Sequence, residues 1–234
     1  MQDTRSQAST DLLLARCAEL ALALPLGQRD PAGPVVQPEE IHAAHAALAA
    51  VAEAYCIMRG QPVCWLRDQA EQITPLLAEE AVAPGVSASL VASAFVAPRG
   101  GWTPDVPRAE IVRTLEAALL WLLDNPRQPS TRPLSCAERL RQYAQKQAAD
   151  SLFGLRTFRR ARARGLSFAA QRAYQRRLRR RCALTLLLLA SWRGNDAAAL
   201  IGEATRVARV PRPTGALPAE QRWDQARVRI ATTR

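Results

Sequence analysis

The residues best suited to chemistry in this sequence are arginines gathered between Arg139 and Arg181. The stretch holds thirteen arginines and Lys146 against a single acid, Asp150, so its net charge is +13, whereas the whole chain carries +11. A guanidinium group presents several N–H donors in a rigid fork that matches the oxygens of a phosphate group. Positive charge concentrated in one part of an otherwise balanced chain predicts a polyanionic partner.

The candidate nucleic-acid-binding residues are the arginines on both sides of Gly165. Contacts from arginine to backbone phosphates give salt-dependent affinity that is largely independent of sequence. The candidates are Arg156, Arg159, Arg160, Arg162, Arg164, Arg172, Arg176, Arg177, Arg179, Arg180 and Arg181. A solvated surface, an acidic protein partner and a lipid surface are the alternatives that the charge alone leaves open.

Aromatic residues interleave these arginines. They are Phe153, Phe158, Phe168 and Tyr174. Such rings can stack on nucleic-acid bases. Their spacing relative to Leu152 and Leu155 favours packing in the core for at least half of them.

Two helices joined by a turn at Gly165 are expected to position the arginines. Ser135 and Glu138 have the spacing of a capping box, which predicts a helix beginning at Cys136. Gly165 is a suitable stop, and Ser167 is a suitable cap for the next helix. Both helices are longer than those of a DNA-reading helix-turn-helix, so an antiparallel αα-hairpin is favoured.

The second helix of this hairpin is expected from Phe168 to about Trp192. Its inner stripe is Tyr174, Leu178, Cys182, Leu186 and Leu189. The first half is rich in arginine and is predicted to be exposed. The second half is apolar on most sides and is predicted to be buried.

Helical periodicity also covers most of the remaining chain. Further helices are expected at 11–24, 38–58, about 62–81 with a division at Pro75, 108–123 and about 196–208. Residues 86–96 are ambiguous between helix and strand, with helix favoured by alanine and serine. The segment from Pro218 is either a short helix bearing Trp223 and Ile230 or an arm that orders on a partner. The predicted fold class is therefore all-α, a multi-helix bundle with an arginine-rich αα-hairpin.

The charge balance changes at residues 124–135, a segment that contains three prolines and two serines. Residues 1–138 carry a net charge of −6 and residues 139–234 carry +17. We therefore predict an acidic helical part at 1–123, a linker at 124–135, the basic hairpin with its following helix at 136–209, and a basic proline-containing tail at 210–234.

The residues that could support catalysis or bind a metal are poorly arranged. His42 and His45 lie three residues apart, and together with Cys56 and Cys64 they match no common zinc spacing. The sequence has no glycine-rich phosphate loop and no nucleophile signature. We expect no catalytic residues, no metal site and no cofactor.

The adjacent acidic residues also give no sign of a catalytic site. Glu39 and Glu40, like Glu79 and Glu80, are adjacent in sequence and do not face one another on a helix. They are expected to act as helix-end charges that favour solubility. The chain is therefore predicted to be non-catalytic.

The chain is expected to be soluble and cytoplasmic. Its five cysteines are scattered without a close pair, which fits a reducing compartment. No secretory signal is apparent at the N-terminus. The longest uncharged apolar run, Cys182 to Trp192, is about half the ~20 residues that a membrane span requires.

Together these features predict a non-catalytic helical subunit that binds the DNA or RNA backbone. The acidic part would pack on other protein subunits of a larger nucleoprotein assembly. In build, though through no shared motif, the chain is similar to small helical subunits of CRISPR effector ribonucleoproteins. That resemblance implies that arginines hold the backbone while base pairing supplies sequence. Alternatives are a stand-alone DNA-binding regulator or plasmid-maintenance protein, and an adaptor that binds an acidic protein.

Overall fold

A computed structural model describes most of the chain, and every regular element in the described part is a helix. The described residues are 2–25, 32–60, 85–97, 101–123, 134–152, 168–193, 196–213 and 217–233, and they form eight helices and no strand. The all-α prediction is confirmed. The helix expected at about 62–81 and the turn at Gly165 lie outside the described residues.

Four of the described helices precede residue 124. They are α1 (Gln2–Ala23), α2 (Pro38–Arg59), α5 (Ala88–Val96) and α6 (Arg108–Leu123). The last three follow the expected positions closely, but α1 begins nine residues before the expected Asp11. Its polar first turns are held by α2, because the hydroxyl of Ser9 is buried and donates to the carbonyl oxygen of Ala54 at 3.0 Å.

The other four described helices follow residue 133. They are α7 (Cys136–Leu152), α9 (Phe168–Ala190), α10 (Ala197–Ala208) and α11 (Ala219–Thr232). The capping box of α7 is formed as predicted, since Ser135 N donates to Glu138 Oε2 at 2.8 Å and Glu138 N donates to Ser135 Oγ at 3.3 Å.

The segment from Pro218 is a helix rather than an extended arm. The side chains of Trp223 and Ile230 are fully buried, and the indole Nε1 of Trp223 donates to the carbonyl oxygen of Leu187 at 2.6 Å. The single indole N–H thus finds an acceptor inside the core, as a buried tryptophan requires. These contacts fix α11 on α9.

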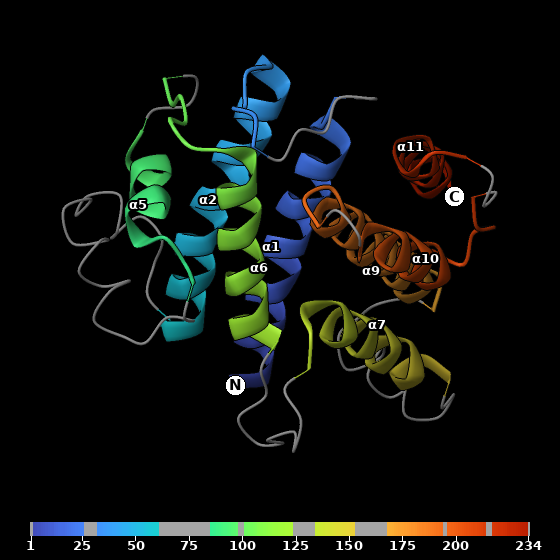
Figure 1. The fold of residues 1–234 in the computed structure, drawn as a ribbon. Helices are drawn as coiled ribbons and strands as arrows, with labels where there is room; N and C mark the ends of the chain where they lie inside the picture. Colours follow the sequence, from blue (N-terminus) through green and yellow to red (C-terminus); the bar gives the residue numbers. More distant parts are fainter. Residues whose placement is uncertain are drawn as a thin grey trace.

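Helix α1 lies at the centre of the arrangement (Figure 1). It packs against α2 on one side and against α9 on the other, while α5 covers the outer side of α2. Helix α9 in turn packs against α7, α10 and α11. One apolar cluster includes residues from both sides of the predicted linker, for example Leu48, Leu115 and Leu186. Residues 124–133 of that linker lie outside the described residues.

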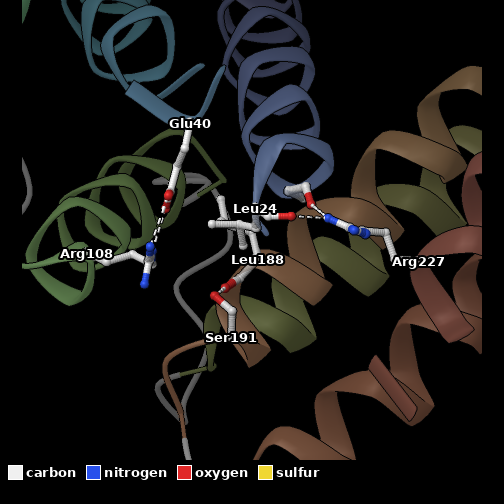
Figure 2. A network of polar contacts seen from close by, with 7 residues as sticks. Leu24, Glu40, Arg108, Leu188, Ser191 and Arg227 are labelled. Atoms are coloured by element: carbon white, nitrogen blue, oxygen red, sulfur yellow. Dashed lines mark hydrogen bonds and ion pairs between the residues drawn. The ribbon is translucent and has the colours of Figure 1, made fainter. Parts of the chain in front are cut away.

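Two buried arginines tie helix ends together (Figure 2). Arg108 at the start of α6 forms a bidentate ion pair with Glu40 in the first turn of α2, and Nη2 lies 2.9 Å from Oε2. Arg227 of α11 donates to the carbonyl oxygens of Leu22 and Leu24 at the end of α1. Arg227 thereby satisfies carbonyl groups that the end of a helix leaves without partners.

The position of Glu40 corrects the expectation that both acids of its pair serve as surface charges. Glu39 is exposed, but Glu40 is fully buried. A carboxylate tolerates burial only when it is paired and hydrogen-bonded. Arg108, 68 residues away, supplies that pairing.

Helix α2 also meets the length and composition of a membrane span, the one such helix among the described residues. However, 61 % of its apolar window is buried inside the protein. An apolar core helix of a soluble protein meets the same two criteria, so the finding is weak support for a membrane segment.

Candidate nucleic-acid interface

The predicted arginines fall into two groups. Arg156, Arg159, Arg160, Arg162 and Arg164 lie outside the described residues. The other six lie on the first half of α9, where Arg172, Arg176 and Arg177 are exposed and Arg179, Arg180 and Arg181 are half-buried. The second half of α9, from Cys182 to Ala190, is buried throughout. The predicted burial of the apolar second half is confirmed, whereas the basic first half is only partly exposed.

Four of the six arginines share one face of α9. Arg172, Arg176, Arg179 and Arg180 recur at spacings of four, three and one, which places them within about 100° of the helix circumference. Tyr174 and Leu178 lie on the opposite face, where Leu178 is buried and Tyr174 is hydrogen-bonded to Asp11. These contacts fix the rotation of the helix, so the four arginines share the side away from them, where Arg172 and Arg176 are exposed and Arg179 and Arg180 are half-buried. We call them the α9 arginine face.

The positive charge of this face is only partly balanced within the protein. Among the described residues, none of Arg176, Arg177 and Arg180 forms an ion pair with another described residue. On neighbouring elements the charges are paired: Glu203 of α10 lies between Arg141 and Arg206. The α9 arginine face therefore retains positive charge that an external anion can approach.

A polar cluster fixes the inner side of the basic half. The Tyr143 hydroxyl of α7 donates to Asp11 Oδ1 of α1 at 3.0 Å, and the Tyr174 hydroxyl of α9 donates to Asp11 Oδ2. Gln7 Nε2 donates to Tyr174 Oη at 2.9 Å. Three helices thus meet at one carboxylate.

Burial raises the pKa of Asp11, while the two tyrosine hydroxyls and the charge of Arg181 act in the opposite direction. Arg181 therefore acts on Asp11 from the inner side of α9, away from the α9 arginine face. Sequence reasoning placed Tyr174 on the inner stripe but did not find Asp11 as its partner. No local signal links two residues that are 163 positions apart.

The residues considered for metal binding do not come together. His42 is exposed, whereas His45 is buried, with its Nε2 3.3 Å from the carbonyl oxygen of Ala97 and its ring against Trp102. Cys64 lies outside the described residues. Within the described part of the chain, no group of three or more His, Cys, Asp or Glu side chains is placed to hold a metal ion.

The described cysteines are buried free thiols. Burial raises the pKa of Cys17 and Cys182 to about 12 and that of Cys56 to about 11. Burial also raises the pKa of Cys136. Because the thiolate is the nucleophile, these cysteines are poorly reactive near neutral pH.

Comparison of the chain with known proteins finds no match. The chain matches no protein-family model, no curated protein and no solved structure. The function therefore has to be argued from the chemistry of the chain itself.

What the described site can do follows from its geometry. The α9 arginine face is a cationic surface about two and a half turns long, borne on a helix whose far end is embedded in the core. Guanidinium groups spaced along such a surface can each donate two hydrogen bonds to a phosphate group. The surface offers donors and positive charge, which suits binding of an extended polyanion.

Proposed function

We propose that the chain is a non-catalytic nucleic-acid-binding subunit that contacts the DNA or RNA backbone through the basic half of α9 and the arginines between Arg156 and Arg164. The observation that carries the proposal is the α9 arginine face. Four arginines recur on one side of this helix, while Leu178 on the opposite side is buried in the core.

Rigidity is what favours a backbone ligand over a loosely solvated surface. Ordering a free arginine side chain costs conformational entropy, and part of that cost is avoided when the helix carrying it is already fixed. Contacts to phosphates also release counterions, which adds a favourable contribution at low salt. A fixed row of guanidinium groups is therefore suited to a repeating row of phosphates.

The charge distribution along the chain supports membership of a larger nucleoprotein assembly. Residues 1–138 carry a net charge of −6, so this part repels a polyanion and is available for protein neighbours. The basic part, with +17, would face the nucleic acid. Sequence would be read elsewhere in such an assembly, because phosphate contacts do not distinguish bases.

The test is charge reversal on α9. Arg176, Arg177, Arg179 and Arg180 are changed together to glutamate, and binding of labelled mixed-sequence DNA and RNA is followed by fluorescence anisotropy. We expect binding to be lost while the circular dichroism spectrum stays native. A control variant reverses Arg16, Arg59 and Arg113, which lie on α1, α2 and α6, and it should keep most of the affinity.

Four results would contradict the proposal. Equal affinity of the α9 variant and the wild type would remove the site assignment. Absence of any DNA or RNA binding at low salt would favour an adaptor for an acidic protein. Binding that depends strongly on sequence would favour a stand-alone regulator, and nucleic-acid cleavage abolished by a chelator would show that the chain is an enzyme.

A further inference from the structure

Helices α9 and α10 bring two arginines together at one end of their contact. Helix α9 ends at Ala190 and α10 begins at Ala197, and the two pack closely, so they form an antiparallel pair. Arg179 lies about three turns before the end of α9, and Arg209 lies about three turns after the start of α10. Burial and the nearby charge of Arg209 both lower the pKa of Arg179, which agrees with this placement.

Arg209 occupies a backbone position that usually belongs to glycine. Its φ of 60° and ψ of 40° are left-handed. Arg209 N donates to Arg206 O at 3.1 Å and Val210 N donates to Thr205 O at 3.0 Å, the pair of bonds that defines a Schellman cap. Among the described residues, no other residue besides glycine has a positive φ. Arginine is less favourable than glycine in this backbone conformation, so the conformation does not explain why an arginine occupies the position.

The segment that follows Arg209 is fixed in place. The Arg229 Nη1 atom of α11 donates to the carbonyl oxygens of Pro211 at 3.1 Å and Arg212 at 3.0 Å. Val210 packs against the apolar core. The exposed Arg209 side chain therefore projects from an anchored turn and not from a free tail.

Among the described residues, no acid forms an ion pair with Arg179 or Arg209. The acid on α10 that lies nearest in sequence, Glu203, is already engaged by Arg141 and Arg206. Two guanidinium groups near each other repel, and an anion between them is attracted to both, which outweighs that repulsion. Such an arrangement suits one anion contacted by both arginines.

We propose that Arg179 and Arg209 together bind one phosphate group of the nucleic-acid backbone, so that the interface continues from α9 across to the C-terminal end of α10. The inference rests on the proposed function. It extends the binding surface to a second helix, α10, and gives the direction in which the nucleic-acid backbone crosses the two helices. On the α9 arginine face, Arg172, Arg176 and Arg179 lie in succession along the helix, and Arg209 follows on the neighbouring helix. A backbone bound along this line would cross the α9–α10 pair.

The substitution Arg209→Gly separates binding from stability. Glycine suits the left-handed cap, so we expect a melting temperature that is unchanged or raised by about 2–4 °C. Loss of one phosphate contact should weaken binding of labelled mixed-sequence DNA or RNA by about tenfold. It should also reduce the slope of log affinity against log salt by about one.

Two further variants test whether the arginines share one phosphate. Arg179→Gln alone should weaken binding to a similar degree, and the double variant should lose clearly less affinity than the two single losses combined. Arg59→Gln removes one positive charge from α2, whose main packing partners are α1, α5 and α6. That control should keep both the affinity and the salt slope of the wild type.

The outcomes separate this inference from the proposed function. If the wild type binds nucleic acid and Arg209→Gly binds equally well with the same salt slope, the shared phosphate site is wrong while the function stands. If the wild type binds no nucleic acid, both fail. If inorganic phosphate stabilises the wild type but not Arg209→Gly, and nucleic acid does not bind, the site takes free phosphate and the assignment to a backbone is overturned.

Discussion

Arg108 and Arg227 lie buried, and each donates to oxygen atoms of the protein itself. Arg176 and Arg177 are exposed on α9 and point to solvent. Arginine therefore has two roles in this protein, as a buried donor to other parts of the chain and as an exposed surface charge. The exposed role was predictable from sequence, because a dense run of arginines cannot be placed in a core. The buried role was not, because single arginines at scattered positions form no recognisable pattern.

The two carboxylates with the most specific partners were also missed from sequence. Asp11 and Glu40 both sit near the expected start of a helix, which a favourable helix dipole explains equally well. Their partners Tyr174 and Arg108 are distant along the chain. Only the packing of α1 on α9, and of α2 on α6, brings them together. Local patterns cannot supply such contacts.

Replacement of Asp11 by asparagine should change how stability depends on pH. The pKa of Asp11 is raised in the folded protein, mainly by burial. Between the ordinary value of 3.8 and the raised value, the folded state binds more protons than the unfolded state. The contribution of Asp11 to stability is therefore largest at acidic pH and is lost as pH rises through that window.

The measurement is the melting temperature of the wild type and of Asp11→Asn from about pH 3.5 to pH 7.5, a range that spans the ordinary titration of a carboxyl group. The stability of the wild type relative to the variant should fall as pH rises. A difference that stays constant, or one that grows with pH, would show that the carboxylate is not held in an unfavourable environment.

Helix ends show how far local signals reach at the scale of elements. Gly60 ends α2 in a left-handed conformation with φ 73°, a position that suits glycine. Ser135 and Glu138 cap α7 as predicted. Arg209 ends α10 in a similar conformation although it is not a glycine, and the first turns of α1 form without an apolar stripe. In these two cases tertiary packing, and not a local sequence signal, determines where the helix ends or begins.

Truncation of the inner stripe of α9 should destabilise the fold. Leu178 is 2 % exposed and Leu186 is 0 % exposed. Changing either one to alanine removes buried methyl groups and leaves a cavity. We expect each change to lower the free energy of unfolding by about 2–5 kcal/mol. Denaturant unfolding followed by circular dichroism measures the loss.

A matched control is Leu22→Ala on α1, where the side chain is 41 % exposed. This change should alter the free energy of unfolding by no more than about 0.5 kcal/mol. If the two α9 variants were as stable as the control, α9 would not be anchored in the core. The fixed direction of the α9 arginine face would then lose its physical basis.

At the scale of the whole molecule, charge divides the chain but the apolar core does not. The sequence changes from net −6 to net +17 near residue 138. The core nevertheless joins α1, α2 and α6 to α9 and α10 in one cluster. Periodicity indicated which face of each helix is apolar, so most core residues were predictable. It could not indicate which helices pair, because every apolar stripe is compatible with several partners.

The salt dependence of binding tests the molecule as a whole. Each phosphate contacted on duplex DNA contributes about −0.9 to the slope of log affinity against log salt. The four arginines of the α9 arginine face would give a slope of about −4, and engagement of all eleven candidate arginines would give about −10. We therefore expect a slope between these limits, measured by fluorescence anisotropy from about 50 to 300 mM salt.

The lower limit belongs to the four arginines on the side of α9 that lies opposite the buried Leu178. The six candidate arginines of α9 together with Arg209 could contribute about −6, so a steeper slope would indicate that the arginines from Arg156 to Arg164 take part as well. A slope near zero would contradict backbone binding, because an interface made of guanidinium–phosphate contacts must release counterions when it forms. Mixed-sequence and single-sequence duplexes should give the same slope, since phosphates carry no sequence information.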